Sequence, residues 1–470
     1  MAGRMTGRLT HDIEQATPRG RNRYVDALRV AALTAVVLGH WMVPVFATED
    51  GGLTVRLVMT EHPWTRWVTW VFQVMPVFFI VGGFANAAAW SRASANGETA
   101  VAWASRRARR LLRPLLPLVA VWVVVVVAGE LAGFEDRWLA QASQSALVPA
   151  WFLAVYVVVT VAVPVTARID ARIGLWPALG LLVIVSALSD AVSAAGWNAA
   201  QWTNFVWVWF AIHQLGIAWH RRGLLGPAGG TALLAGGLAV LYGLVTLAGY
   251  PADMVAEANG QTNATPPSVA MLALATAQLG VIALGRGVGE RVLTRPRVWA
   301  PVAIAGRRIM SIFLWHMTAM IAVAAALGAI GWLPLSDALG WGWWASRPVW
   351  LLTCAAALAV IVVVVAWAER IRDGASGPAS GQAPDPASGP ASDQPSGLAS
   401  GASEPSTPSA PGPVAVTAGA GVAALAVGVL AAGGVHDPEG PLGLALWPLL
   451  AVVAAMGALG VLDPDRGRRS

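Results

Sequence analysis

Residues 24–46 read YVDALRVAALTAVVLGHWMVPVF, an apolar run that includes Asp26, Arg29 and His40. An α-helix rises about 1.5 Å per residue, so about 20 apolar residues cross the hydrocarbon core of a bilayer. Runs of this kind recur along the whole chain. They predict an all-α fold, a polytopic bundle of transmembrane helices, and this first run also contains the side chains from which a function can be argued.

The composition excludes most soluble functions. Of the 470 residues, 56% are hydrophobic and 12% are charged, whereas soluble domains have about 25% charged residues. The formal net charge is +6. The sequence contains no Lys, so all of its 31 Lys and Arg residues are Arg. These Arg residues lie mainly at the ends of predicted helices on one side of the membrane. We therefore interpret the positive charge as a topology signal and expect no nucleic-acid partner.

Twelve apolar windows are long enough to cross a bilayer. Ten of them form a core, and the last two form a C-terminal two-helix hairpin. Their approximate ranges are 24–46, 67–90, 112–131, 147–166, 173–192, 201–219, 230–250, 268–286, 308–331, 348–368, 414–434 and 441–462.

The Arg residues alternate regularly with these windows. Clusters of Arg fall in the N-terminal tail, before the third window, between the eighth and ninth windows and at the C-terminal end. Cytoplasmic loops are enriched in Arg and Lys, so the alternation predicts that both termini are cytoplasmic. The expected location is the bacterial cytoplasmic membrane, which the chain crosses many times.

The expected domains follow from the same windows. Residues 1–23 form a cytoplasmic tail, 24–370 the ten-span core, 371–412 a linker, 413–463 the hairpin and 464–470 a second cytoplasmic tail. The linker is rich in Gly, Ala, Ser and Pro, a composition that cannot bury a core, so we expect it to be disordered. Neither hairpin span contains an ionisable group, and we expect the hairpin to act as an anchor or a packing element.

Arg29 and His40 are eleven residues apart in the first span. Eleven residues turn a helix by about 1100°, close to three full turns, so both side chains lie on one face about 16 Å apart along the axis. Ionisable side chains within a span normally face a bundle interior or a watery cavity and mark function. A second interpretation stays open, in which Asp26 neutralises Arg29 at one interface and His40 reaches the other.

Two further histidines lie within predicted spans. His316 is in the middle of the ninth span, where its depth favours a function, although a hydrogen-bonded structural role fits the same position. His213 is followed by Gln214 in the sixth span, and we interpret this pair as helix packing or cavity lining.

The remaining polar residues give weaker indications of function. Glu130 and Asp190 fall at predicted outer ends of helices, where we expect them to be solvated, and His436 lies in a predicted loop. Cys354 is the only cysteine. No paired Cys and no short His spacing of the zinc-binding kind appears, so we expect no metal site.

Several segments together resemble acyltransferase family 3, a family of integral membrane O-acyltransferases. Arg29, ten intervening residues and His40 resemble the opening helix of that family. Residues 75–84, MPVFFIVGGF, are similar to its second-helix segment, except that Gly82 stands where the family usually has Ser. The basic stretch 106–114, the run Trp151-Phe152-Leu153 and residues 311–316 also resemble family segments.

The resemblance implies transfer of an acyl group, with acetyl as the default, from cytoplasmic acyl-CoA to a hydroxyl of a carbohydrate, glycolipid or similar acceptor. Acyl-CoA would be a co-substrate, and no bound cofactor is expected. Arg29 and His40 would be essential, with His40 acting as a general base or carrying an acyl-imidazole, and His316 orienting His40 or assisting proton transfer. Arg29 is expected to engage the donor's phosphates or thioester together with Arg106, Arg107, Arg109, Arg110 and Arg113.

Two other classes of function stay open at the level of sequence. A small-molecule transporter or exporter would also use buried Arg and His in a polytopic bundle, although the chain shows no internal repeat of the kind that many transporters have. A non-enzymatic scaffold or sensor would use the linker and the hairpin to bind partners. That class gives no reason for Arg29 and His40 to share a face.

Overall fold

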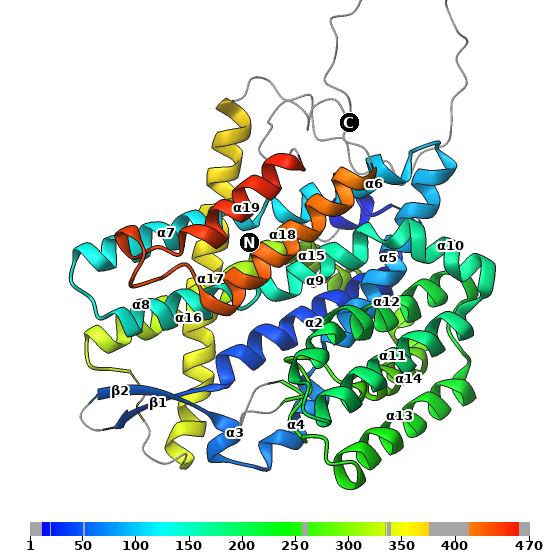
Figure 1. Ribbon diagram of the computed structural model, residues 1–470, viewed down its shortest axis with the longest axis horizontal. Coiled ribbons are helices and arrows are strands. Elements are labelled where there is room, and N and C mark those ends of the chain that lie inside the picture. Colours follow the sequence, from blue (N-terminus) through cyan, green and yellow to red (C-terminus); the bar gives the residue numbers. More distant parts are fainter. Residues whose placement is uncertain are drawn as a thin grey trace, which may run out of the picture.

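A computed structural model describes residues 12–459, except 19, 50, 51, 256–261, 334, 336–339 and 376–412. About 80% of the described residues are helical and strand is almost absent, which confirms the all-α fold class (Figure 1). The expected C-terminal tail and nearly all of the expected linker lie outside the described residues, as does the first part of the N-terminal tail.

Nine helical segments of the described chain are long and apolar enough to cross a membrane. They correspond to nine of the ten predicted core spans. The segments are α2 (Arg23–Met42), α4 (Thr65–Phe72) with α5 (Met75–Ala95), α6 (Ala100–Leu112) with α7 (Leu115–Leu131), α8 (Asp136–Leu147) with α9 (Ala150–Val161), α11 (Leu175–Ala194), α13 (Pro227–Leu247), α14 (Val269–Val292), α16 (Ile309–Ala329) and α17 (Trp341–Ala375).

Proline divides three of these segments into two helices each. Pro76 lies in the first turn of α5, Pro114 immediately before α7 and Pro149 immediately before α9. Proline lacks an N–H and collides with the preceding turn, so it is tolerated at a helix start but interrupts a continuous helix. The breaks therefore follow directly from the sequence.

The predicted span 201–219 corresponds to α12 (Asn204–Arg222), which is not one of the nine segments. It contains Asn, His and Gln, and most of these polar side chains are buried against protein instead of facing lipid. Gly216 lies against the backbone of Ile80 on α5, and a Cβ at Gly216 would be 1.9 Å from the Ile80 carbonyl oxygen. Small residues allow membrane helices to approach this closely. The full count of twelve spans stays a prediction.

A two-stranded antiparallel sheet follows α2. Strands β1 (Pro44–Glu49) and β2 (Gly52–Leu57) pair with Pro44 opposite Leu57, and α3 (Val58–Glu61) comes next. The first predicted window extended to residue 46, but α2 ends at Met42 because Pro44 has no N–H to donate to the carbonyl oxygen of His40. Short helices α10 (Val163–Ile173), η1 (Asn198–Thr203) and α15 (Pro296–Arg307) complete the core.

The C-terminal hairpin consists of α18 (Pro413–Gly433) and α19 (Leu446–Ala458), with η2 (Pro441–Gly443) in the turn between them. Helix α18 packs against α9, α8 and α6, and α19 packs against α18 (Figure 1). The surface of α18 that faces the core consists of small and aliphatic side chains, including Ala420, Ala423, Val427 and Leu430. The hairpin is therefore packed against the flank of the bundle.

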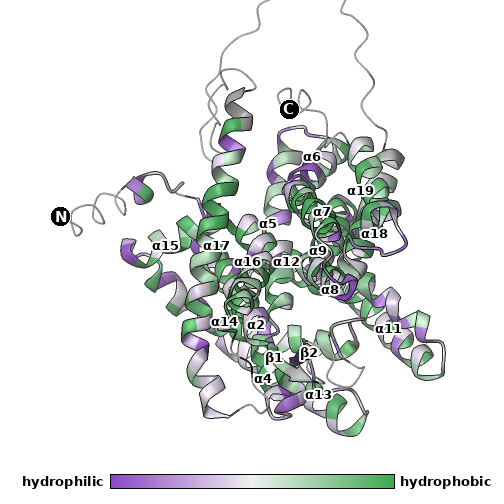
Figure 2. Ribbon diagram, turned by 90° about the vertical axis from the view of Figure 1, so that its left-hand side faces the viewer, coloured by the Kyte–Doolittle hydropathy of each residue, from purple (hydrophilic) through white to green (hydrophobic). Residues whose placement is uncertain are grey.

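Apolar residues predominate along most of the helices (Figure 2), and many of them are exposed on the outside of the bundle. On α17, for example, Val360, Val363 and Trp367 are exposed in the chain taken by itself. A large exposed apolar surface marks contact with lipid or with another protein. This surface fits a bundle that lies in a bilayer, with its polar groups turned inward.

Candidate functional site

His40 and His316 meet in the centre of the bundle. His40 Nδ1 lies 2.7 Å from His316 Nε2, and the two ring planes differ by 8°. His40 lies near the C-terminal end of α2, and His316 lies on α16 with no exposed surface. The structure thus brings together two histidines that are 276 residues apart and that the sequence singled out separately.

The neighbouring groups define how each ring is protonated when both are neutral. His316 Nδ1 lies 2.5 Å from the carbonyl oxygen of Phe313, which can only accept a hydrogen bond, so Nδ1 carries the hydrogen. Neutral His316 then accepts at Nε2, and His40 donates to it from Nδ1. In this arrangement the Nε2 atom of His40 has no hydrogen and offers a free lone pair.

Two tryptophans hold the pair in place. Trp41 donates from its indole N–H to the carbonyl oxygen of His316 at 2.9 Å, and Trp350 of α17 donates to the carbonyl oxygen of Trp41 at 2.8 Å. These bonds connect α17 to α2 and α2 to α16 beside the two rings. Side chains whose positions are fixed by such supporting bonds keep the geometry that proton transfer requires.

Arg29 lies eleven residues before His40 on α2. Its contacts bear on whether it is neutralised by Asp26 or remains able to bind a ligand. Its guanidinium is 3.7 Å from Asp26, but Asp26 is much closer to Arg21, at 2.6 Å. Arg29 Nε is buried with no hydrogen-bond partner among the described residues. Neutralisation of Arg29 by Asp26 is therefore incomplete, and the guanidinium retains capacity for a ligand.

The predicted arginine cluster divides into members with different surroundings. Arg106 is paired with Glu98 at 2.6 Å, while the guanidinium of Arg107 lies over the ring of Trp103, 5.5 Å from its centroid. Arg110 and Arg113 are exposed, and Arg109 is partly buried. The charges of Arg107 and Arg29 both act on the hydroxyl of Tyr156 on α9. Arg107 and Arg29 therefore both lie within electrostatic range of Tyr156.

Aromatic rings occupy the interior between Tyr156 and His316. Phe152 stacks on Tyr156 with centroids 5.1 Å apart and meets Phe313 edge to face at 5.2 Å. Phe313 in turn lies 5.9 Å from the ring of His316, and Phe78 of α5 packs on Phe152 at 4.9 Å. The segments on α2, α5, α9 and α16 that carried the resemblance thus surround one interior region, although they are far apart in sequence.

A buried polar cluster adjoins this region. The side-chain amide nitrogen of Asn86 on α5 is 3.1 Å from Thr160 Oγ1, 3.3 Å from His213 Nε2 and 3.4 Å from the Tyr156 hydroxyl. A Cβ at Gly82 would lie 2.6 Å from that same hydroxyl, so the glycine leaves the space that Tyr156 occupies. His213 lines the packed contact between α5 and α12, in line with its interpretation from the sequence.

The sequence did not single out Tyr156 as a candidate. A lone tyrosine in an apolar helix has no distinctive spacing, and its position beside Arg29 and Arg107 depends on the packing of three helices. The nearest signal was the run Trp151-Phe152-Leu153, which begins one turn earlier on the same helix.

Two acidic residues that we expected to be solvated have partners in the structure. Asp190 is 8% exposed and accepts hydrogen bonds from Asn204, from Tyr250 and from the backbone N–H of Val269, so the expectation was wrong for this residue. Val269 is the first residue of α14, and a carboxylate there satisfies a backbone donor that a helix start leaves free. Glu130 is partly exposed and contacts His436 of the hairpin at 2.8 Å.

Comparison with known proteins gives one match. A family model described as "Acyltransferase domain" matches residues 22–367, which include both histidines, Arg29 and all the aromatic residues described above. Neither the curated proteins nor the solved structures gave a match. The matched region ends within α17, so α18 and α19 lie beyond it.

Proposed function

Because the chain belongs to acyltransferase family 3, we propose that this membrane acyltransferase moves an acyl group, acetyl by default, from cytoplasmic acyl-CoA to a hydroxyl of a carbohydrate, glycolipid or similar acceptor. The observation that carries the proposal is the contact between His40 and His316, which leaves Nε2 of His40 free to accept a proton.

His40 acts at the acceptor end of the reaction. A general base must present a lone pair at hydrogen-bond distance from the proton that it removes. The hydrogen bond from Nδ1 to His316 orients the ring and directs Nε2 away from its partner. When Nε2 takes a proton, the positive charge that develops on His40 is stabilised by the lone pair of His316 Nε2. His316 is thus a positioning residue for His40.

The bond changes balance without any additional reactant. The acceptor O–H bond breaks as its proton moves to His40 Nε2, and the acceptor oxygen bonds to the carbonyl carbon of the thioester. The carbon–sulfur bond then breaks, and the CoA thiolate leaves with the proton that His40 returns. In the alternative course, His40 Nε2 bonds to the carbonyl carbon of the thioester while the carbon–sulfur bond breaks and CoA leaves as the thiolate. In a second step the acceptor oxygen attacks the acyl-imidazole, the bond from Nε2 to the acyl carbon breaks, and the acceptor proton goes to the CoA thiolate.

Arg29 and Arg107 act at the donor end. Arginine stays charged and offers a planar fork of donors that matches phosphate oxygens. Arg29 retains capacity for a ligand, and both Arg29 and Arg107 lie within electrostatic range of Tyr156. With the positive-inside orientation, these groups face the cytoplasmic half of the membrane, from which acyl-CoA arrives. The aromatic rings between Tyr156 and His316 give the acyl end an apolar surface on its way to His40.

The test is an acyl-transfer assay on purified full-length protein in nanodiscs with labelled acetyl-CoA. His40→Ala should lower the rate of acetyl-CoA consumption by about 10²- to 10⁴-fold relative to the wild type, the usual contribution of a general base. His220→Gln is the matched control, since His220 is near the end of α12 and contacts the ring of Phe84, outside the histidine pair. A turnover rate in folded His40→Ala equal to that of the wild type would refute the mechanism.

The same assay separates the two chemical courses. A label that stays on wild-type protein denatured rapidly at neutral pH and is absent from His40→Ala indicates an acyl-imidazole, whereas turnover without a protein-bound label indicates general-base catalysis. Donor consumption by neither protein would redirect the search to other acyl donors, and then to transport of a labelled solute into vesicles.

A further inference from the structure

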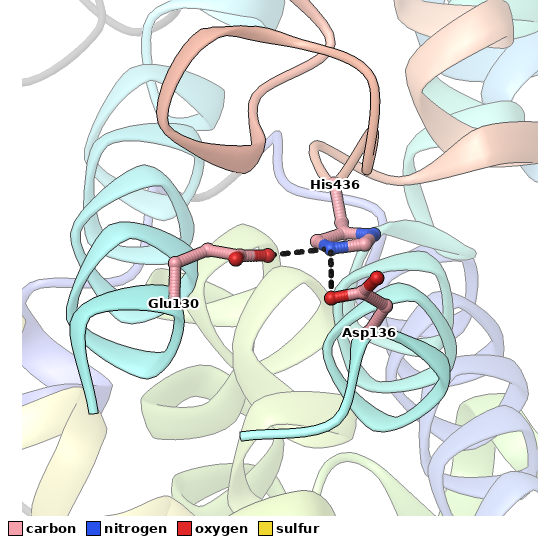
Figure 3. A group of neighbouring side chains, drawn as sticks. All are labelled: Glu130, Asp136 and His436. Carbon is pink, nitrogen blue, oxygen red and sulfur yellow. Dashed lines mark hydrogen bonds and ion pairs between the residues drawn. The ribbon is translucent and has the colours of Figure 1, made fainter. Parts of the chain in front are cut away.

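Three potential metal ligands meet where the hairpin touches the core (Figure 3). Glu130 lies near the end of α7, Asp136 begins α8, and His436 lies in the turn between α18 and α19. His436 Nε2 is 2.8 Å from a carboxylate oxygen of Glu130 and 4.0 Å from one of Asp136. One donor atom from each residue lies within 4.8 Å of the other two. We propose that these residues bind one zinc-like divalent cation and so fasten the hairpin to the core.

The histidine is buried and aimed at the two carboxylates. Its side chain is 1% exposed, and Nδ1 is buried without a hydrogen-bond partner among the described residues. Nε2 therefore makes the polar contacts of this ring, and both of them are to acidic groups. An imidazole that is held in apolar surroundings and directed at carboxylates has the arrangement of a metal ligand.

The charges at the cluster favour a cation. Glu130 and Asp136 bring two carboxylates together, and no arginine of the described chain pairs with either of them. The neighbouring Arg137 is 2.6 Å from Glu135 and lies over the ring of Trp138 instead. Like charges this close repel each other unless a positive group lies between them. A divalent ion would balance both carboxylates at once.

Backbone hydrogen bonds hold the turn around His436 in place, so the three ligands form a largely preformed site. The hairpin turn is closed by backbone bonds from Ala445 to Val435 and from Asp437 to Gly443, both 2.9 Å. Gly443 lies so close to Glu130 that a Cβ there would be 2.6 Å from its side chain. The turn therefore rests directly on the two ligands of the core, and only small rearrangements are needed to place three donors around one ion.

The donor set indicates which ion fits. Calcium and magnesium prefer ligand sets made of oxygen alone. Imidazole nitrogen suits zinc and its first-row neighbours, and one histidine with two carboxylates leaves a fourth tetrahedral position for water. The side chain of Asp136 is 62% exposed, so the cluster is open to solvent on one side. Zinc is therefore the ion for which this cluster is best suited.

The cluster shares no residue with the histidine pair, and it lies away from the arginine cluster. It lies at the end of α7, whereas the arginine cluster lies on α6 at the opposite end of the same segment. Spacing patterns within the sequence did not predict it, because they detect ligands that are close together, and His436 is 306 residues from Glu130. The expectation that no metal site exists was based on such patterns alone.

The experiment uses the full-length protein in detergent after removal of metal by a chelator. Addition of zinc chloride should raise the unfolding temperature of the wild type by several degrees, and the dialysed protein should retain about one zinc ion per chain. Magnesium chloride and calcium chloride at the same concentration should leave the unfolding temperature unchanged. His436→Gln should abolish both the zinc-dependent shift and the retained zinc.

A second variant and a control guard against a folding defect. Asp136→Asn changes an exposed ligand and should weaken zinc retention at least tenfold while the protein still purifies as a folded species. Glu135→Gln changes the adjacent acid, which pairs with Arg137, and should retain wild-type zinc binding. Equal zinc retention by wild type and both ligand variants would overturn the proposal, as would equal stabilisation by zinc, magnesium and calcium.

Discussion

At the scale of single residues, the chemistry proposed for the histidine pair depends on which nitrogen of each ring carries a hydrogen. The carbonyl oxygen of Phe313 determines the tautomer of His316, and His316 determines that of His40. Spacing along α2 predicts that Arg29 and His40 share a face, but it cannot predict a hydrogen bond to a residue on another helix. The pair becomes a chemical unit only when α2 and α16 pack together.

The positioning role of His316 leads to a kinetic prediction. His316→Ala removes the acceptor for His40 Nδ1, so the ring loses its orientation, and kcat should fall by about 10²-fold or more. The KM for acyl-CoA should change little, because the proposed donor site lies near Arg29 and not at His316. The measurement is steady-state kinetics of acyl transfer.

His316→Gln provides the comparison, because its amide oxygen can accept the same hydrogen bond. It should recover part of the lost kcat. Equal kcat values for wild type and His316→Ala, in protein of equal thermal stability, would show that His316 has only a packing function.

Arg29 should affect donor binding. Arg29→Gln removes the charge and should raise the KM for acyl-CoA by roughly 10- to 100-fold, the effect of losing a hydrogen bond to a charged group. Arg29→Lys keeps the charge without the planar fork and should fall between wild type and Arg29→Gln. The KM for acetyl-CoA measures this effect.

Arg291→Gln is the control for loss of positive charge, because Arg291 is exposed in the last turn of α14 and is not one of the arginines expected to engage the donor. A KM for acetyl-CoA that is unchanged in Arg29→Gln would contradict the placement of the donor beside Arg29.

At the scale of elements, the contact between α5 and α12 fixes the polar interior. A Cβ at Gly83 would be 2.1 Å from the carbonyl oxygen of His213, and Gly216 faces Ile80 just as closely. Backbone atoms cannot give way as the end of a flexible side chain can. The two glycines therefore set the distance between the helices that carry Asn86 and His213.

Substitution at this contact should be costly. Gly83→Ala should lower the free energy of unfolding by about 1–3 kcal/mol through overpacking, and it should reduce activity by moving α5. Gly236→Ala on α13 is the matched control, because a Cβ there meets no atom within 4 Å and should change stability by less than about 1 kcal/mol in the favourable direction. Thermal unfolding in detergent compares the two variants. Equal unfolding temperatures for both would mean that the helices can separate without cost.

At the scale of the whole molecule, hydropathy and proline positions predict most of the architecture. The apolar windows locate nine membrane-length segments, and prolines mark where three of them break. The segment α12 was predicted in place, but it falls outside the nine because its polar and charged residues make it less apolar than they are. The contacts of Asp190 and His436 could not be predicted, because they join segments that only the packed bundle brings together.

The orientation in the membrane is open to a direct test. Cys354 is buried, so the wild type should react little with a membrane-impermeant maleimide. Ser94→Cys, at the end of α5 on the predicted cytoplasmic side, should be protected in intact cells and react after permeabilisation. Ala132→Cys, after α7 on the opposite side, should react in intact cells. The reverse labelling pattern would invert the topology.

The main-chain acceptor at residue 313 has an evolutionary consequence. Because a carbonyl oxygen of the backbone fixes the tautomer of His316, a change of side chain at position 313 leaves that oxygen in place as long as the helix persists. The tautomers of the two histidines are thus unaffected by substitutions of the side chain at position 313. A lineage could replace Phe313 while it adapts to a new acyl group or acceptor and still inherit the same histidine tautomers, so that substrate range could diversify while the proton transfer stays the same.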